Sequence, residues 1–258
     1  MLDCVLRTEK IRKFFGGVRA IEDFSMELFS EETRGIIGPN GAGKTTIYNC
    51  ISGIYKLDGG EITLGGTRTT EMAQEEIARL GLSRTFQNTR LFPGLSVLDN
   101  VKVAVDWGGK YTMFQAMLRT PKVRREERRI QEEAMRCLKT ARLDGYANMR
   151  PQNLSYGIQR RLEIARALAS RPKVLMLDEP AAGLNPEEVS QLIDFIAEIR
   201  ENFHLSLLII EHKMDVIMQL CSRIYVQDSG MTIAEGCAEE IQANPVVLAA
   251  YLGEAKKA

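Results

Sequence analysis

The sequence predicts an α/β fold with a parallel-sheet core, and two segments carry most of that prediction. In the first, the apolar pair Ile36-Ile37 precedes a glycine-rich stretch, and apolar residues then recur at helical spacing from Ile47 to Ile54, which indicates strand, loop and helix. In the second, residues 174–177 form a short apolar run that ends in two acids, typical of a strand buried on both faces. Helices and strands then alternate through residue 228, as in parallel-sheet proteins.

The segments that flank the first strand and helix are rich in β-forming residues. Apolar side chains alternate at Phe24, Met26 and Leu28, and Asp58-Gly59-Gly60 supplies a turn before a short strand at 61–64. We therefore expect residues 1 to about 34 and 58–68 to form an antiparallel β subdomain. At 258 residues with 45% apolar content, the chain is expected to be one domain, 1–258, with a substantial core.

The glycine-rich stretch has the spacing G-x-x-x-x-G-K-[ST] of a phosphate-binding P-loop. Its glycines let successive backbone N–H groups turn inward on a polyphosphate, and the helix N-terminus adds partial positive charge. Lys44 can reach the terminal phosphates, and the Thr45 hydroxyl can hold Mg²⁺. The predicted nucleotide-binding residues of this P-loop are Gly38, Asn40, Gly41, Ala42, Gly43, Lys44, Thr45 and Thr46.

The two acids after the second apolar run lie at the carboxyl end of their strand, which is where open α/β sheets bind ligands. Asp178 would then join the Mg²⁺ shell. Glu179, one residue on, would polarise an attacking water as general base. The alternative is a core strand that ends in two solvated acids without a function. The presence of a P-loop in the same chain favours the functional interpretation over this alternative.

A third segment, Leu154-Ser155-Tyr156-Gly157-Ile158-Gln159, opens a predicted helix for which Ser155 is the expected N-cap. Together with the P-loop it resembles the signature of ATP-binding-cassette (ABC) ATPases, usually written L-S-G-G-Q, and the resemblance covers nearly the whole chain. In that family the signature of one subunit closes over the nucleotide in the P-loop of another. The resemblance therefore implies a head-to-tail dimer in which Ser155 and Gly157 contact ATP bound to the partner.

The signature departs from the family pattern at two positions. Tyr156 replaces the first of the paired glycines, and Ile158 replaces the glutamine. Ile158 removes a side-chain amide that could touch nucleotide, and Gln159 is not assumed to take over its role.

Two further residues gain a role only from the resemblance. Gln87 matches the family's Q-loop glutamine, which samples Mg²⁺ and water and reports on the transmembrane partner. His212, after the apolar run 205–210, resembles the switch histidine that contacts the γ-phosphate and supports Glu179. Lys213 stands where an Asp usually follows, which leaves the hydrogen bonding around His212 open. His204 is expected to be an exposed loop residue.

Phe15 matches the position where the family stacks an aromatic ring on adenine, although Phe14 or Phe15 could equally be core. In the family's D-loop region, Asn185 replaces the usual aspartate. Asn185 with Pro186 and Glu188 has the pattern of a capped helix start, so we expect a cap first and a dimer contact second.

Whole-chain properties exclude several classes of protein. The 34 basic and 34 acidic residues leave no net charge and therefore no general field for nucleic acid. Five cysteines without C-x-x-C spacing indicate reduced thiols in the cytoplasm, not disulfides or zinc. Residues 1–13 are interrupted by charge, unlike a signal peptide, and no apolar run approaches the roughly 18 residues that span a bilayer. If the protein serves a membrane, we expect it to do so from one side.

A helical insert is predicted at about 88–165, with the signature at its end. Six of the eleven residues at 119–129 are Lys or Arg, which suggests a surface for membrane or nucleic acid. Interleaved glutamates and a continuing apolar stripe at Met135, Leu138 and Leu143 instead favour a solvated helix. In the ABC family, the region after Gln87 helps to form the groove for a short helix of the transmembrane subunit. Leu91, Phe92 and Leu95 could therefore line such a groove or anchor the insert to the core.

Four motifs, at 84–92, 160–166, 181–186 and 250–254, together with the Tyr156 variant of the signature, resemble the LivG-type ATPases of branched-chain amino-acid importers. This resemblance implies an ATP hydrolase, with ATP and Mg²⁺, on the cytoplasmic face of the membrane. Its implied partners are a second ATPase, either a copy or a paralogue, two transmembrane permease subunits and, indirectly, a solute-binding protein. Alternatives are the ATPase of a urea or amide importer or of a lipid or lipopolysaccharide exporter, and less so a soluble ABC protein. An ATPase subunit never touches the solute, so the solute rests on resemblance alone.

Overall fold

The computed structural model describes residues 3–86, 90–105 and 120–255, with side chains described to Tyr251. The chain forms two units. The core unit comprises residues 1–87 and 173–258, and the helical unit comprises residues 88–172.

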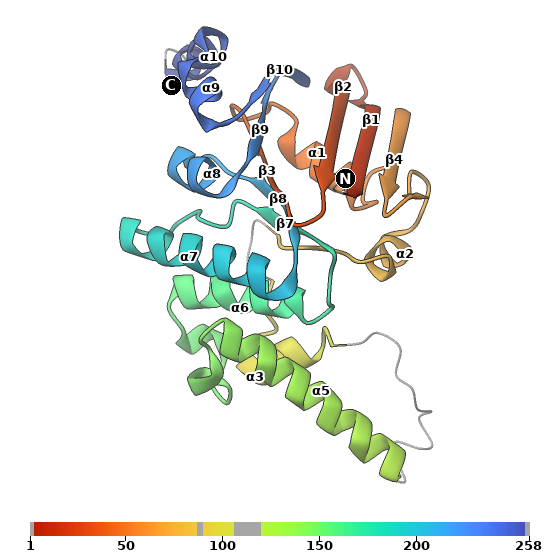
Figure 1. Ribbon diagram of the computed structural model, residues 1–258, viewed down its shortest axis with the longest axis vertical. Coiled ribbons are helices and arrows are strands. Elements are labelled where there is room, and N and C mark those ends of the chain that lie inside the picture. The colour runs from red at the N-terminus through yellow and green to blue at the C-terminus, as the bar shows by residue number, and fades with distance from the viewer. Residues whose placement is uncertain (1–2, 87–89, 106–119, 256–258) are drawn as a thin grey trace. The chain divides into compact units, whose positions relative to one another are not determined.

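The core unit is built on a sheet of ten strands, counted over the described residues, in the order β5-β4-β1-β2-β10-β9-β3-β8-β7-β6 (Figure 1). The strands are β1 Cys4–Phe15, β2 Val18–Phe29, β3 Thr33–Ile37, β4 Gly59–Leu64, β5 Thr67–Arg68, β6 Leu82–Arg84, β7 Val174–Asp178, β8 Ser206–Ile210, β9 Arg223–Asp228 and β10 Met231–Gly236. From β6 through β7, β8 and β3 to β9 all neighbours are parallel, and β3, β7 and β8 are buried at every residue. This confirms the predicted α/β fold with a parallel core.

The rest of the sheet is mostly antiparallel. β2 pairs with β1, β1 with β4 and β4 with β5, all antiparallel. Phe24, Met26 and Leu28 are all buried, as their alternation predicted. The two parts of the sheet meet where Met231 of β10 pairs with Asp23 of β2.

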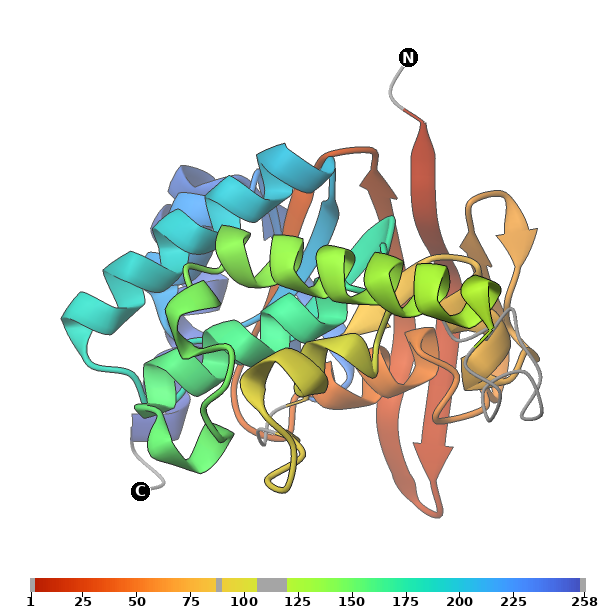
Figure 2. The same ribbon diagram turned by 90° about the horizontal axis from the view of Figure 1, so that it is seen from below.

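Helices cover both faces of the core sheet, and Figure 2 shows α1 and α7 on opposite faces. The helices of the core unit are α1 Lys44–Ile51, α2 Gln74–Arg79, α7 Pro186–Phe203, α8 Met214–Leu220, α9 Ala238–Ala243 and α10 Pro245–Ala255. α1 buries Ile47, Tyr48 and Ile51 in one apolar cluster with residues of β3, β7 and β8. Because β3, β7 and β8 each pair with a strand on both sides, the ladder can satisfy their backbone groups while both faces of the sheet are buried.

One sequence prediction about α1 is wrong. Ile54 was expected to continue its apolar face, but the helix ends at Ile51 and the Ile54 side chain is 38% exposed. Gly53 adopts a left-handed φ of 74°, where a Cβ would lie 2.7 Å from the side chain of Ile77. The glycine ends the helix because this backbone conformation is open to it and strained for other residues.

The predicted start of α7 is confirmed. The Asn185 side chain accepts a hydrogen bond from the backbone N–H of Glu188, and the Glu188 carboxylate accepts one from the Asn185 N–H, which together form a capping box. Pro186 occupies the first helical position. His204 ends the helix with φ of 50° and a side chain 76% exposed, so its predicted exposure is also confirmed.

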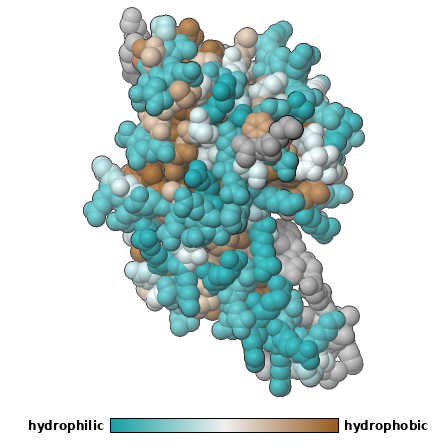
Figure 3. Space-filling model, viewed as in Figure 1, coloured by the Kyte–Doolittle hydropathy of each residue, from teal (hydrophilic) through white to brown (hydrophobic). Residues whose placement is uncertain are grey.

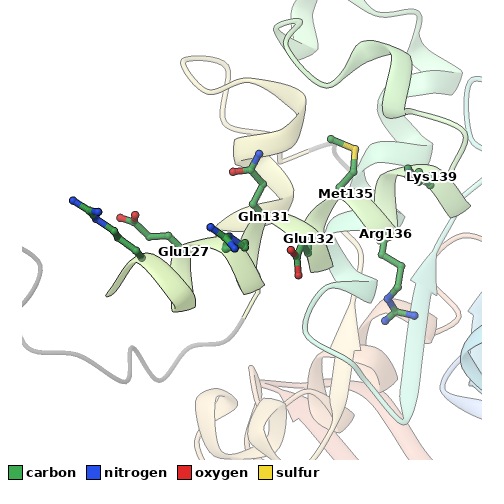
Figure 4. A pocket seen from close by; sticks show the side chains of 8 residues that line it. Glu127, Gln131, Glu132, Met135, Arg136 and Lys139 are labelled. Carbon is green, nitrogen blue, oxygen red and sulfur yellow. The ribbon is translucent and has the colours of Figure 1, made fainter. Parts of the chain in front are cut away.

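The helical unit contains α3 Val97–Lys102, α5 Pro121–Thr140, α6 Tyr156–Leu168 and short 3₁₀ turns at Asp144–Tyr146 and Pro151–Asn153. α5 buries a stripe that includes Val123, Ala134, Cys137 and Leu138. Its opposite face carries the charged run, and the surface over α5 is almost wholly hydrophilic in Figure 3. The eight residues that line a hollow on this face all belong to α5 (Figure 4). This confirms a solvated amphipathic helix, and Leu138 lies on its buried face as predicted. The placement of Met135 on the apolar stripe is wrong, because Met135 lines the hollow on the charged face.

All five cysteines lie in described parts of the chain and none forms a disulfide. Burial raises the pKa of Cys50 to about 12 and that of Cys137 to about 11, so both stay protonated at neutral pH. Among the described residues, no helix is both long enough and apolar enough to cross a membrane.

Candidate nucleotide site

The predicted P-loop joins β3 to α1 within the core unit. Gly38 has φ of 148°, and a Cβ there would lie 2.0 Å from the carbonyl oxygen of Gln227. Gly43 has φ of 96°, and a Cβ there would lie 2.1 Å from the carbonyl oxygen of Ala20. Side chains at either position would therefore push the loop away from the neighbouring backbone. The two glycines of the motif allow a turn that packs this closely.

Lys44 lies at the first position of α1 and is 5% exposed. Its Nζ donates hydrogen bonds to the carbonyl oxygens of Gly38 at 2.7 Å and Pro39 at 2.8 Å, so the ammonium is held inside the loop. The first turn of α1 contains no acidic residue. The N–H groups and dipole of this helix end therefore favour an anion beside the ammonium.

A cavity of about 430 Å³ opens at this loop. Its walls combine residues 40–46 with Glu179 and His212, which the sequence predicted, and with residues 18–20 and Ser229, which it did not. No local pattern marks residues 18–20 as part of a site. They reach it because the start of β2 lies against the P-loop, where Gly43 approaches the backbone of Ala20.

Glu179 follows β7 directly and has a left-handed φ of 46°, which is rare for a residue with a side chain. Its backbone N–H donates to the carbonyl oxygen of Ile210, at the end of the next strand. Glu179 Oε1 lies 2.8 Å from His212 Nε2. An ionised carboxylate can only accept, so this hydrogen bond requires the proton on Nε2. The two residues that the sequence assigned to base and switch are thus in direct contact.

Asp178, the last residue of β7, is 2% exposed. Its Oδ2 lies 3.4 Å from Nη2 of Arg84, whose Nη1 donates to Asn49 Oδ1 and Ser52 Oγ, each at 2.9 Å. Arg84 therefore connects the end of α1 to the predicted Mg²⁺ ligand. The sequence offered Arg84 only as a marker of similarity to a subgroup, and its structural role depends on a contact across 94 residues.

Tyr48 is a second residue whose role the sequence did not reveal. It is fully buried on α1, and its hydroxyl lies between the carbonyl oxygens of Leu177, at 3.1 Å, and Leu208. Burial holds the pKa of Tyr48 well above its usual value, so the hydroxyl remains a donor. The contact fixes α1 against β7 and β8, the strands that carry Glu179 and His212.

Phe14 and Phe15 are 37% and 43% exposed, so the alternative that either residue belongs to the core is wrong. They are the last two residues of β1, whose end is exposed. Phe15 packs edge-to-face on Tyr55 with ring centroids 5.2 Å apart. Stacking of Phe15 on adenine stays a prediction.

The signature lies in the helical unit at the start of α6. Ser155 is confirmed as the N-cap, since its side chain accepts from the backbone N–H of Ile158. Tyr156 is 42% exposed and Gly157 is half-buried. Gln159 donates through Nε2 to the carbonyl oxygen of Leu154 at 3.0 Å, so its amide is used within its own chain.

Gln87 lies outside the described residues. In the following segment Phe92 is 46% exposed, while Leu91 and Leu95 are half-buried. Asn100 holds this segment, because its Oδ1 accepts from the Phe92 N–H at 2.8 Å and its Nδ2 donates to the Phe92 carbonyl oxygen at 3.1 Å. The segment is thus anchored within the helical unit and still presents an apolar side chain to solvent.

Comparison with known families agrees with this geometry. The family model described as "ABC transporter" matches residues 21–182, and the model described as "Branched-chain amino acid ATP-binding cassette transporter" matches residues 231–257. The chain is similar to the solved structure of a nucleotide-free ATP-binding cassette from an ABC transporter. The TM-score is 0.84 and the identity 29%, over 96% of this chain and 99% of that one.

Two relatives have similar length. A high-affinity branched-chain amino acid transport ATP-binding protein of Salmonella typhimurium, LivG, is 46% identical over 93% of this chain and 94% of its own. The corresponding protein of Pseudomonas aeruginosa, BraF, is 41% identical over 97% and 98% of the two chains. Similarity of this extent, together with the P-loop, Glu179 and His212 on one cavity, shows that the chain belongs to the ATP-binding-cassette transporter ATPases.

Proposed function

We propose that this ATPase powers the import of branched-chain amino acids across the cytoplasmic membrane. The observation that carries the proposal is the match of residues 231–257 to a family model named for branched-chain transporters. Those residues lie outside the P-loop and the strand ends that every ABC ATPase needs. A match there supports a particular transporter class more strongly than a match in the ATP motifs would.

The residues of the core unit divide the chemistry of hydrolysis among themselves. Residues 40–46 bind the phosphates through their backbone N–H groups, and Lys44 among them adds its side-chain ammonium. Glu179 accepts a proton from the attacking water, and His212 orients that carboxylate and contacts the γ-phosphate. His212 contacts Glu179 directly, so the base and the residue that orients it are paired within one chain.

The residues present are suited to Mg²⁺, which neutralises phosphate charge when it is bound. Mg²⁺ prefers oxygen ligands and uses one or two protein groups beside substrate phosphates. The Thr45 hydroxyl is exposed at the start of α1, and the Asp178 carboxylate lies at the end of β7. The described residues contain no cluster of three or more acidic, His or Cys side chains for a metal, which agrees with a site that phosphates complete. Gln87 is proposed as a further ligand.

The composite site requires a second ATPase. Ser155 and Gly157 stand at the exposed N-terminus of α6, where backbone N–H groups and a hydroxyl can face the γ-phosphate of ATP bound to another subunit. We propose a head-to-tail dimer that is peripheral on the cytoplasmic face and attached to two permease subunits. A solute-binding protein delivers the solute to these permease subunits. ATP closes the dimer because it binds the closed state better than the open one.

The proposal is tested by uptake of labelled leucine in cells whose only copy of this chain is wild type, Glu179→Gln or Glu187→Gln. Glu187 is an exposed acid on α7, so its variant controls for loss of charge. We expect Glu179→Gln to abolish leucine uptake, to lower ATP turnover by about 100-fold or more and to trap an ATP-bound dimer. The control should transport normally.

Uptake of an unrelated sugar serves as a second control. Unchanged leucine uptake in the Glu179→Gln cells, with normal expression, would overturn the solute assignment and point to a urea or amide importer or to an exporter. Wild-type ATP turnover in that variant would instead remove Glu179 from the chemistry.

A further inference from the structure

A buried carboxylate next to the switch histidine has no role in the chemistry described so far. Glu211, at the end of β8, is 2% exposed. Its Oε1 accepts a hydrogen bond from the backbone N–H of Ala181 at 2.6 Å. Its Oε2 accepts from the backbone N–H groups of His212 at 2.9 Å and Lys213 at 3.1 Å. One carboxylate therefore joins the loop after Glu179 to the loop that carries His212.

Lys213 makes a second connection between the same two loops. Its Nζ donates to the carbonyl oxygen of Leu184 at 2.7 Å, and its side chain is half-buried. Leu184 immediately precedes Asn185, the N-cap of α7. The loop after Glu179 is thus held near its start by Glu211 and at its end by Lys213. An ionised Asp at position 213 would have no hydrogen to donate to this carbonyl.

The two connections enclose the contact between Glu179 and His212. Glu179 has a strained left-handed backbone and needs surrounding contacts to keep it. Ala181 and Leu184 follow it within five residues, and Glu211 and Lys213 flank His212 on both sides. A loop tied at both ends fixes where the Glu179 carboxylate lies relative to the imidazole.

We infer that Glu211 and Lys213 are positioning residues, which set the geometry of Glu179 and His212 by tying their loops together. Two hydrogen bonds cross between the loops, at Glu211 and at Lys213, and two more hold the Glu211 carboxylate within its own loop. This inference rests on the proposed roles of Glu179 and His212. Neither positioning residue touches the P-loop cavity. Their effect is therefore on turnover and not on ATP binding.

The test compares Lys213→Met with Lys213→Arg in the full-length chain. Methionine keeps most of the aliphatic stem and loses the donor, whereas arginine keeps a donor of similar length. We expect Lys213→Met to lower kcat for ATP hydrolysis by about 10-fold, within the range that small misplacements of catalytic groups produce. The KM for ATP and the affinity for a non-hydrolysable analogue should change less than about twofold, because the substitution does not alter the contacts that bind ATP in the ground state. Lys213→Arg should recover most of the lost kcat.

Glu211→Gln tests the other connection. The amide has one acceptor oxygen and one donor group, so it must place N–H against at least one of the three backbone N–H groups. We expect a larger fall in kcat than with Lys213→Met. If Glu211→Gln does not fold, the comparison of Lys213→Met with Lys213→Arg decides the question without it.

Two further results separate this inference from the proposed function. In a Glu179→Gln background, Lys213→Met should lower the residual turnover no further, because its effect passes through Glu179. An unchanged kcat in Lys213→Met, or equal losses of kcat and ATP affinity, would overturn the positioning role while leaving the function intact. Wild-type turnover in Glu179→Gln would reject the assigned base itself.

Discussion

The core unit and the helical unit build their functional segments in different ways. In the core unit the cavity combines residues from the P-loop, from the segments that follow β7 and β8, from the start of β2 and from Ser229. In the helical unit the signature is one helix start, with Ser155 capping Ile158 three residues on. The first is an assembly of distant segments. The second is a local structure presented on a surface.

This difference shows where each unit is sensitive to change. The core site depends on long-range contacts such as Tyr48 between β7 and β8, so remote substitutions can move it. The signature depends on whether α6 is folded and held in its own unit. There a buried ion pair contributes, because Arg160 and Glu163 are both 1% exposed and lie 2.9 Å apart.

The largest expected effect in the helical unit comes from breaking that pair. Arg160→Met leaves the Glu163 carboxylate buried without this cation, which should destabilise the helical unit by about 3 to 5 kcal/mol. The affinity of the P-loop for ATP should be nearly unchanged. Denaturant unfolding of the full chain measures the first effect, and titration with a fluorescent nucleotide measures the second.

A matched double variant, Arg160→Met with Glu163→Met, controls for the lost charge. It should recover most of the stability, since apolar replacement of a buried pair is often neutral. A double variant as unstable as the single one would show that packing of Arg160, including its position 5.8 Å above the Tyr156 ring, matters more than its charge.

Lys44→Ala, in the core unit, should have the reverse pair of effects: it should lower ATP affinity and leave the stability of the helical unit unchanged. Loss of the ammonium removes a charged donor from the phosphates, so we expect ATP affinity to fall by about 10- to 100-fold. The stability of the helical unit should not change. Lys56→Ala, at an exposed lysine beyond α1, is the control for one lost charge. Equal ATP affinity of Lys44→Ala and wild type in isothermal titration would contradict the P-loop assignment.

The smallest expected effect is a pH dependence of stability that arises from Glu133 in the helical unit and not from the core unit. Hydrogen bonds from Arg171, with a further contribution from Arg136, lower the pKa of Glu133 in the helical unit from 4.5 to about 2. Because the folded pKa is the lower one, the carboxylate stabilises the fold fully above about pH 4.5 and loses this effect as pH falls towards 2. The exposed Arg171 side chain weakens the effect through solvent screening.

We therefore expect Glu133→Gln to destabilise the helical unit by about 1 to 3 kcal/mol at pH 7. The difference from wild type should shrink as the pH is lowered to 3. Unfolding free energies from denaturant titrations across this range provide the measurement. A difference that stays constant with pH would mean that Glu133 acts through packing or neutral hydrogen bonds.

Sequence reasoning succeeded where neighbouring residues decide the structure. The caps at Ser155 and Asn185 and the buried runs of β7 and β8 were all predicted from local patterns. It failed at Ile54, where helical spacing continued but Gly53 ended the helix. It also left the partner of Lys213 open, because that partner, Leu184, lies 29 residues earlier in the chain.

By itself, the sequence determined the P-loop, the strand that ends in Asp178 and Glu179, and the family to which both belong. These features follow from spacing, since glycine, lysine and carboxylate positions act within a few residues of one another. Only the tertiary structure decided that residues 18–20 border the cavity, that Glu179 contacts His212, and that Glu211 joins their loops. Such contacts depend on which strands lie side by side, and no local pattern in the chain encodes that order.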